Sequence, residues 1–335
     1  MTDAVPLRAA VVGVGHWHAA RYIQSLHVLG ERIVAVWDPD RAVAARAATA
    51  CGAETERDLP DLLRRVAPDV IVGMGEHAAM PALIAAMLET SAGLVLEKPL
   101  GTRAADVAPL VERAERDGRF AAVAFTNRYT PMWEAVDALA RTGRLGTPCY
   151  AHFRILNGSP QRYVRDGVGW MLEPARSGGG SLINLGIHGL DGFRRFAGDR
   201  VAVTAAQVCS LAHNLPIEDY ALAVLRGAGG AVGTVESGYC YAAMSGGDQE
   251  WRLITSNAYV VQRADGVTVQ TLDDGQLQRL PGMPADAAYH LFIADSLRRF
   301  RRGVPPIATL RDGLAALELV ERVYQLAGGH HVRAS

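Results

Sequence analysis

The sequence predicts an α/β protein with two parts, and three observations lead to this fold class. From residue 7 to about residue 126, short β-branched runs alternate with stretches of helical periodicity, which is typical of a parallel sheet covered by helices. After Phe125, β-type segments follow one another with turns between them, which favours an antiparallel or mixed sheet. The length of 335 residues suffices for two hydrophobic cores. We therefore expect a first domain over residues 1–126 and a second domain over residues 127–335.

The first domain is expected to alternate strands and helices along the chain. The expected strands are Leu7–Val12, Ile33–Trp37, Val70–Val72, Leu94–Leu96 and Ala121–Ala124, and the expected helices lie near 17–29, 41–50, 58–66, 78–89 and 103–117. Because successive strands are separated by helices, they run parallel, with helices on both faces of the sheet.

The second domain is expected to be of the α+β class. Its expected strands are 148–156, 201–211, 219–225, 231–240, 251–255, 258–263 and 267–272, and its expected helices lie near Pro131–Arg141 and near 181–197, 286–302 and 309–327. The turns Ala264-Asp265-Gly266 and Asp273-Asp274-Gly275 join consecutive β-type segments. Such short connections favour antiparallel pairing.

The composition argues against several classes of partner. The 34 basic and 35 acidic residues leave a net charge of −1, so the chain has no overall positive field that would hold nucleic acid. The longest apolar stretch, Ala78–Leu88, is too short to span a membrane, and the N-terminus carries no secretory signal. The 4 cysteines are far apart, which fits reduced thiols. We expect a cytoplasmic protein with neither nucleic acid nor membrane as a partner.

Lys98 is the only lysine in the chain, since all other members of the 34 basic residues are arginines. An arginine keeps its proton in proteins, whereas burial and neighbouring charges can tune a lysine to exchange one near neutral pH. Lys98 also follows an expected strand directly, and ligands of open α/β sheets lie at this carboxyl edge. Lys98 is therefore a candidate acid or base, with the chance survival of one lysine as the alternative.

A G-x-G turn ends the first expected strand and opens the first expected helix. Gly13 and Gly15 allow a tight turn and a close approach of backbone N–H groups to a pyrophosphate. The usual third small residue is His18 here, so the motif is incomplete. Asp38 ends the second expected strand, where an acid can bind a ribose 2′-hydroxyl and would repel a 2′-phosphate. The pattern favours NAD over NADP, although the nearby Arg41 weakens this preference, and an ordinary βα turn is the alternative.

A second motif runs from Gly178 to Asp191. If the chain is helical after the glycines, Asn184 and His188 stand one turn apart on one face, with Asp191 close below. His188 could then share a proton or a hydrogen bond with a substrate hydroxyl. The alternative is a helix start with a buried, satisfied histidine. We expect no metal site, since the amide of Asn184 is a poor ligand.

The motifs occur in an order that resembles the Gfo/Idh/MocA oxidoreductase family. They are the G-x-G turn, Asp38, Glu97-Lys98-Pro99, Asn127-Arg128-Tyr129, the segment 178–191, and Ile217-Glu218-Asp219-Tyr220 followed by Gly230-Ala231-Val232-Gly233-Thr234. The resemblance implies a Rossmann first domain and a second α+β domain with an open, mainly antiparallel sheet that packs against another subunit, in a homodimer or homotetramer. It also implies that Lys98 is the catalytic lysine and His188 the active-site histidine.

Two positions depart from the pattern of the family. Asn184 stands where the family most often has an aspartate, and an amide can orient a hydroxyl but cannot take a proton. Ala79 stands where a histidine is common, because Met74-Gly75-Glu76-His77-Ala78-Ala79 replaces the pattern T-P-x-x-x-H. The residues expected to contact the cofactor are Gly13, Gly15, His16, Trp17, Asp38, Met74, Glu76, His77, Glu97, Lys98 and Arg128.

These observations predict an NAD-dependent oxidoreductase that transfers a hydride between nicotinamide and a secondary alcohol of a sugar, cyclitol or related polyol. The expected catalytic residues are Lys98, His188 and Asn184, and the residues suggested for the substrate pocket are Arg154, Tyr163 and Trp170. A surface structural role is the alternative for these three, and we favour it for Arg154. Two other functions stay open: an enzyme that retains NAD and carries out epimerisation or an elimination-type glycoside cleavage, and a non-catalytic, cofactor-binding regulatory protein.

Overall fold

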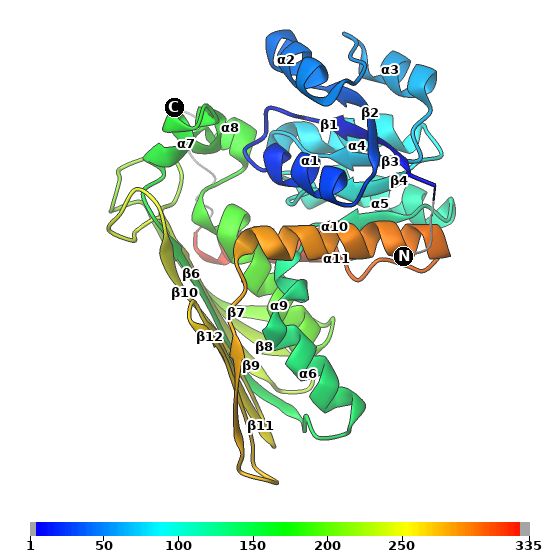
Figure 1. The fold of residues 1–335 in the computed structure, drawn as a ribbon. Coiled ribbons are helices and arrows are strands. Elements are labelled where there is room, and N and C mark those ends of the chain that lie inside the picture. Colours follow the sequence, from blue (N-terminus) through cyan, green and yellow to red (C-terminus); the bar gives the residue numbers. More distant parts are fainter. Residues whose placement is uncertain (1–4, 329–335) are drawn as a thin grey trace. The chain divides into compact units, whose positions relative to one another are not determined.

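The computed structural model describes residues 5–328 of the chain, which forms two compact units (Figure 1). Among the described residues, the first unit comprises residues 5–124 together with Tyr289–Leu314. The second comprises Phe125–Ala288 together with residues 315–328. The chain therefore returns to the first unit after completing most of the second. The division into residues 1–126 and 127–335 stays a prediction about functional domains.

The first unit is built on a parallel five-stranded sheet with the order β2-β1-β3-β4-β5. The strands are β1 (Arg8–Val12), β2 (Arg32–Trp37), β3 (Val70–Gly73), β4 (Gly93–Leu96) and β5 (Ala121–Val123). The helices between them are α1 (Ala19–Val28), α2 (Arg41–Cys51), α3 (Leu59–Val66), α4 (Met80–Leu88) and α5 (Ala104–Arg116), with a 3₁₀ turn, η1, at His77–Ala79. The predicted parallel sheet is confirmed, and each strand differs from its expected bounds by one residue at one end.

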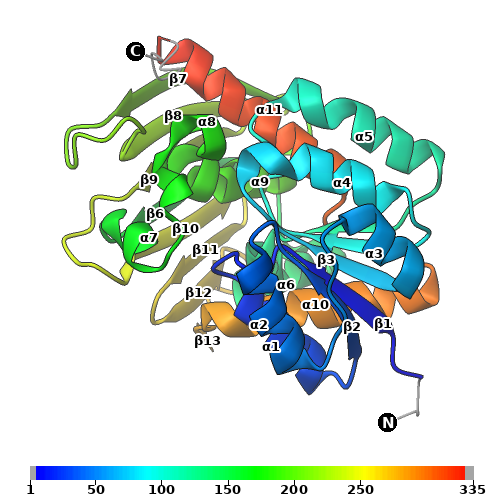
Figure 2. The ribbon, with the colours of Figure 1, turned by 90° about the horizontal axis from the view of Figure 1, so that it is seen from above.

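The order of the strands reverses at β1, which has neighbours on both sides from later parts of the chain. Helices α3, α4 and α5 follow one another along the sheet (Figure 2). The sheet is nearly all apolar and buried, from Ala9–Val12 in β1 to Leu94–Leu96 in β4. Buried strands of this kind leave their carboxyl ends as the place for polar function.

The second unit is built on an eight-stranded sheet with the order β13-β12-β11-β10-β6-β9-β8-β7. Its strands are β6 (Pro148–Asn157), β7 (Val201–Cys209), β8 (Tyr220–Gly227), β9 (Val232–Gly238), β10 (Gly247–Thr255), β11 (Ala258–Arg263), β12 (Gly266–Thr271) and β13 (Leu277–Pro281). All neighbours pair antiparallel except β6 and β9, which are parallel. The predicted open, mainly antiparallel sheet is confirmed.

Helices cover one face of this sheet (Figure 1). Helix α6 (Pro131–Arg141) packs on β11 and β12, and α9 (Ile187–Ala197) packs on β6, β8 and β9. Gly189 allows the close approach of α9, since a Cβ atom there would lie 2.9 Å from Phe153 and from Val235. Two long helices, α10 (Ala285–Arg302) and α11 (Leu310–Leu326), follow the last strand.

Some elements of the second unit escaped the sequence patterns. The strand β13 was not expected, because its five residues are mostly exposed and show no alternation of apolar and polar side chains. The short helices α7 (Gln161–Arg165) and α8 (Pro174–Ser177) and the 3₁₀ turns η2 (Thr126–Tyr129) and η3 (Gly169–Leu172) lack the length for a periodic signal. The helix expected at 181–197 begins with a π-helical turn, η4 (Leu182–Gly186), and becomes α-helical only at Ile187.

Candidate active site

The G-x-G turn places Asp38 against the start of α1. Gly13 has φ of +83°, and a Cβ atom there would lie 1.9 Å from the carbonyl oxygen of Met74, so only glycine fits. The N–H of Gly15 donates to Oδ2 of Asp38 at 2.7 Å, and a Cβ atom on Gly15 would lie 2.9 Å from that same oxygen. The second glycine therefore makes room for the carboxylate at the end of β2.

The start of α1 suits an anion. Its N-cap residue, His18, makes no side-chain cap hydrogen bond to the helix, and no acidic residue lies in the first turn. Backbone N–H groups and the helix dipole at such an end favour negative charge. The His16 ring stacks on Trp17 with 3.8 Å between centroids, and burial together with the charge of His18 lowers the pKa of His16 well below its usual value. The start of α1 therefore fits a dinucleotide, and the role of Asp38 as an acceptor for ribose hydroxyls stays a prediction.

Asp38 itself is partly buried. Burial raises the pKa of its carboxyl group, and the hydrogen bonds from the N–H groups of Gly15 and Asp40 act in the opposite direction. The other cofactor candidates from this region lie at the carboxyl end of β3: Met74 is fully buried, Glu76 is half-buried at the start of η1, and His77 is buried within that turn.

Glu97 follows β4 and is held by three side chains. Its Oε2 atom accepts from the hydroxyl of Tyr22 at 2.9 Å and of Tyr289 at 3.2 Å, and lies 3.1 Å from Nδ1 of His18. Oε1 accepts from the backbone N–H of Lys98 at 3.1 Å. Burial alone would raise the pKa of Glu97, but the proximity of His18 and Lys98 outweighs it and holds the pKa well below the usual range. Glu97 is therefore a buried anion.

Lys98 is buried beside that anion at the carboxyl end of β4, and its peptide bond to Pro99 is cis. Burial lowers the pKa of its amine to about 8, while the charge of Glu97 acts in the opposite direction. A lysine with this pKa can give or take a proton near neutral pH. Because His18 contacts Glu97, the motif after β4 is joined directly to the G-x-G turn at the start of α1.

In the second unit, Asn184 lies in the π-helical turn η4 and is buried. Its Nδ2 atom donates to the hydroxyl of Tyr163 at 2.7 Å and of Tyr239 at 2.9 Å. His188 follows one turn later at the start of α9, is half-buried, and meets the ring of Phe125 edge-on at 6.1 Å between centroids. π-Helical turns occur often at functional sites. The helix predicted after the glycines is confirmed, but its first turn, Leu182–Gly186, is the wider π-helical form.

Glu218 explains why the chain turns at the glycines before this helix. Its carboxylate accepts from the N–H of Gly180 at 2.7 Å and of Leu182 at 2.8 Å, and from the hydroxyl of Tyr324 at 2.9 Å. It therefore satisfies backbone donors at the start of η4. Burial raises the pKa of this carboxyl group, and these hydrogen bonds only partly offset it.

Two arginines suggested from the sequence have acidic partners. Nη2 of Arg128 lies 2.5 Å from Oδ1 of Asp191, and Nε lies 2.9 Å from Oδ2, so Asp191 forms a buried ion pair. Arg154 pairs with Asp248 of β10 at 2.8 Å. These pairs give both arginines structural roles, and binding of cofactor by Arg128 or of substrate by Arg154 stays a prediction. Trp170, in η3, is buried.

Sequence reasoning missed four residues of these clusters: Tyr22 and Tyr289 beside Glu97, and Arg162 and Tyr239 beside Asn184 and Tyr163. Arg162 donates from Nη2 to the hydroxyl of Tyr163 at 2.9 Å. No local pattern marks these positions, since Tyr289 is 192 residues from Glu97 and Tyr239 is 55 residues from Asn184. Only the proximity of Arg162 and Tyr163 in the sequence could have pointed to the pair.

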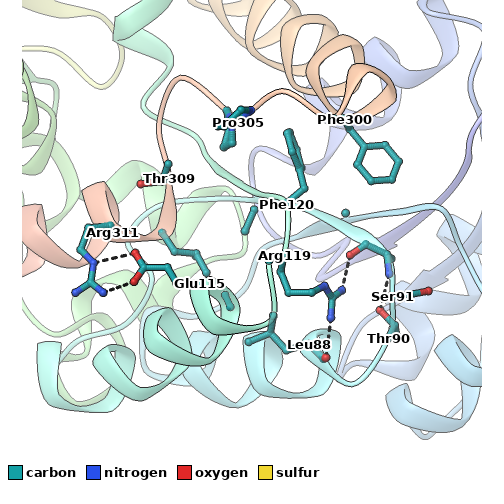
Figure 3. A pocket seen from close by; sticks show the side chains of 18 of the residues that line it. Leu88, Thr90, Ser91, Glu115, Arg119, Phe120, Phe300, Pro305, Thr309 and Arg311 are labelled. Carbon is teal, nitrogen blue, oxygen red and sulfur yellow. Dashed lines mark hydrogen bonds and ion pairs between the residues drawn. The ribbon is translucent and has the colours of Figure 1, made fainter.

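A large cavity of about 820 Å³ lies at the opposite edge of the first sheet, where β4 and β5 begin (Figure 3). Its arginines are engaged: Arg119 donates to the carbonyl oxygens of Leu88 and Ala92, and Arg311 pairs with Glu115. Gly93, at the start of β4, lies in this cavity, whereas Lys98 follows the end of the same strand. The cavity is therefore separate from the candidate site.

The described residues 5–328 contain no cluster of three or more histidine, cysteine, aspartate or glutamate side chains that could hold a metal. In the same range, no helix is long and apolar enough to cross a membrane. All of Cys51, Cys149, Cys209 and Cys240 are free thiols.

The chain belongs to the Gfo/Idh/MocA oxidoreductase family. Residues 7–125 match the family model described as an oxidoreductase family with an NAD-binding Rossmann fold, and residues 133–261 match the GFO/IDH/MocA C-terminal domain. The resemblance seen in the motifs is confirmed. So are the predictions of an oxidoreductase and of NAD as the cofactor.

The relatives agree with this assignment. The chain is 27% identical to inositol 2-dehydrogenase of Rubrobacter xylanophilus, over 95% of this chain and 90% of that protein. It is 25% identical to D-apiose dehydrogenase of Paraburkholderia graminis, over 96% and 88%. An inositol dehydrogenase homologue of Azotobacter vinelandii, solved with NAD⁺, shares the fold with a TM-score of 0.84 and 20% identity, over 97% of this chain and 96% of that one.

Proposed function

We propose that the chain is an NAD-dependent dehydrogenase that oxidises a secondary alcohol of a sugar, cyclitol or related polyol. The observation that carries the proposal is the buried Lys98 with a pKa of about 8, joined through Glu97 and His18 to the start of α1. Relatives named for inositol and apiose support the substrate class. Bound NAD supplies the oxidant, its nicotinamide ring.

Lys98 acts as the base in this proposal. At pH 7 about a tenth of a lysine with a pKa near 8 is neutral, and this fraction can take the proton of a substrate hydroxyl. The ionised Glu97 holds the backbone of Lys98 through Oε1 and is itself oriented by His18, Tyr22 and Tyr289. The amine therefore starts from a fixed backbone position.

His188 and Asn184 bind hydroxyl groups of the substrate in this proposal. The imidazole can donate or accept a hydrogen bond near neutral pH. Asn184 has an amide where the family most often has a carboxylate, so it orients but does not take a proton. Its orientation is set by the hydroxyl groups of Tyr163 and Tyr239.

The oligomer and the location complete the proposal. We propose a homodimer or homotetramer through the face of the eight-stranded sheet that α6 and α9 do not cover. Side chains on that face, such as His152, Thr234 and Glu236, are half-buried in the single chain. Light scattering of the purified protein gives the number of subunits. The free thiols fit the cytoplasm.

The test of the function is a screen of inositols, aldoses and sugar acids with NAD⁺, followed by the absorbance of NADH. We expect stoichiometric release of free NADH with at least one compound. Turnover of a sugar without free NADH would instead show an enzyme that retains its cofactor. Binding of NAD without turnover of any compound would show a regulatory protein.

A further inference from the structure

The cluster around Asn184 carries a positive charge that no acidic side chain of the described region pairs with. Arg162 lies in α7 and is half-buried. Its guanidinium donates a hydrogen bond to a neutral group, the hydroxyl of Tyr163, at 2.9 Å. The exposed Asp166 interacts electrostatically with Arg162 but forms no ion pair with it, and Arg165 holds Asp166 through two hydrogen bonds of 2.7 and 3.2 Å. Arg162 therefore differs from Arg128 and Arg154, which both pair with aspartates.

The guanidinium of Arg162 is held in place by two aromatic rings. Its Cζ atom lies 4.8 Å from the ring centroid of Tyr163 and 5.9 Å from that of Tyr239. Stacking of this kind orients the planar group without neutralising it. Both tyrosines also accept from Nδ2 of Asn184. One hydroxyl group, that of Tyr163, thus connects the arginine to the amide.

The acidic groups near this cluster have other partners, and Asp166, which interacts with Arg162, is bound by Arg165. Asn184 is neutral, and Glu218 is occupied by the N–H groups of Gly180 and Leu182 and by Tyr324. A family member with aspartate in place of Asn184 would have a carboxylate beside the two tyrosines. Here the same place combines a neutral amide with an arginine, so the local field favours an anion.

We propose that Arg162 binds a carboxylate of the substrate, so that the enzyme acts on a sugar acid in preference to a neutral polyol. This inference rests on the proposed dehydrogenase function and specifies its substrate. A guanidinium presents parallel N–H donors that match the two oxygens of a carboxylate. A single guanidinium also balances the single charge of a carboxylate, whereas a dianionic phosphate would need a second cation.

The test compares acids with neutral compounds of the same hydroxyl pattern, using the full chain and NAD⁺. The pairs are gluconate with glucitol and glucuronate with glucose, and kcat/KM is measured from NADH release. We expect the acid of at least one pair to be preferred. In Arg162→Gln, kcat/KM for that acid should fall about 10- to 100-fold, mainly through KM, because a hydrogen bond to a charged group is lost. For the neutral compound of the same pair, kcat/KM should change less than about threefold in this variant.

Two further variants separate charge from folding. Arg162→Lys should keep part of the preference for the acid, since it keeps the charge but not the fork of donors. Arg226→Gln removes an exposed arginine of β8, away from Asp166, and should leave kcat/KM unchanged for both members of a pair. A preference for the neutral compounds, an equal loss for acid and neutral in Arg162→Gln, or a preference for glucose 6-phosphate would overturn the proposal.

The failure of this inference can be told from failure of the proposed function. NADH from neutral polyols alone would leave the dehydrogenase standing and contradict the role of Arg162. If no compound yields NADH, the proposed dehydrogenase function is wrong. Calorimetric binding of gluconate to the NAD-loaded protein then tests the binding of a carboxylate by Arg162 separately. Binding that is lost in Arg162→Gln and kept in Arg226→Gln supports it, and any other result contradicts it.

Discussion

Each unit contains a buried glutamate that accepts a hydrogen bond of 2.9 Å from a buried tyrosine, yet the two carboxylates have opposite surroundings. Glu97, after β4, is contacted by His18 and lies next to Lys98, and its pKa is lowered although burial opposes this. Glu218, before β8, is contacted by the backbone N–H groups of Gly180 and Leu182, and burial raises its pKa.

The comparison shows that burial alone does not set the charge of a carboxyl group. Near Glu97, the hydrogen bond to His18 and the proximity of Lys98 overcome the cost of burial, so a stable anion stands beside a lysine that can exchange its proton. Near Glu218, only neutral dipoles compensate, and the group serves to begin a helix. In the proposed mechanism the first carboxylate supports the chemistry of Lys98, whereas the second binds backbone donors at the start of η4.

The largest expected effect follows from removing the base beside Glu97. In Lys98→Met, kcat should fall about 10²- to 10⁴-fold, because proton transfer is lost. The kcat of Lys98→Arg should fall as far, since an arginine keeps the positive charge but does not release its proton near neutral pH. Steady-state NADH release measures both. Binding of NAD, measured by calorimetry, checks that the variants fold. By contrast, Glu218→Gln should lower the stability of the fold more than it lowers turnover. Wild-type turnover in Lys98→Arg would refute the catalytic assignment.

The second largest effect concerns the ion pairs of the second unit. Asp191→Asn removes the negative charge from the buried ion pair with Arg128 and should destabilise the fold by about 3–5 kcal/mol. The matched change Asp248→Asn touches the more exposed pair with Arg154 and should cost no more than about 1 kcal/mol. Urea unfolding gives both values. Equal costs would mean that Arg128 is not held by Asp191 in solution.

Two matched tyrosine variants test the contrast between the glutamates directly. At neutral pH, Tyr22→Phe should destabilise the protein by about 1.5–3 kcal/mol, because a donor to a buried charge is lost. The cost of Tyr324→Phe should decline first as the pH falls, since the raised pKa of Glu218 means that it takes up a proton before Glu97 does. Unfolding curves between neutral and mildly acidic pH measure this. Parallel declines would contradict the comparison.

The sign of the linkage differs between the two groups. Glu97 has a lowered pKa in the folded state, so its contribution to stability is present above the unfolded value of 4.5 and is lost as the pH falls below it. Glu218 has a raised pKa in the folded state, so the folded protein binds this proton more readily than the unfolded chain does. The contribution of Glu218 to stability is therefore present below the unfolded value of 4.5 and is lost as the pH rises through the folded pKa.

The smallest effect is the pH dependence of turnover. Oxidation needs neutral Lys98, so kcat/KM should rise about tenfold for each pH unit below its pKa of about 8 and level off above it. Reduction of the ketone product with NADH needs the protonated amine and should fall above about pH 8. Initial rates in both directions measure this, and the same pH dependence in both directions would exclude Lys98 as the titrating group.

The sequence alone determined the parallel sheet of the first unit, the glycine turn with Asp38, and Lys98 as a candidate acid or base. These features depend on local periodicity and on short motifs, which can be recognised from residues that are close together in the sequence. It also identified Asn184 as a departure from the family pattern, because the motif around it is contiguous.

Only the tertiary structure decided which charges meet. It paired Arg128 with Asp191, 63 residues away, and brought Tyr289 to Glu97 across 192 residues. It also left Arg162, which no motif marks, as the arginine beside Asn184 and Tyr163 without an acidic partner among the residues described. The physical reason is that hydrogen bonds, ion pairs and pKa values depend on neighbours in space and on burial, and a linear pattern contains neither.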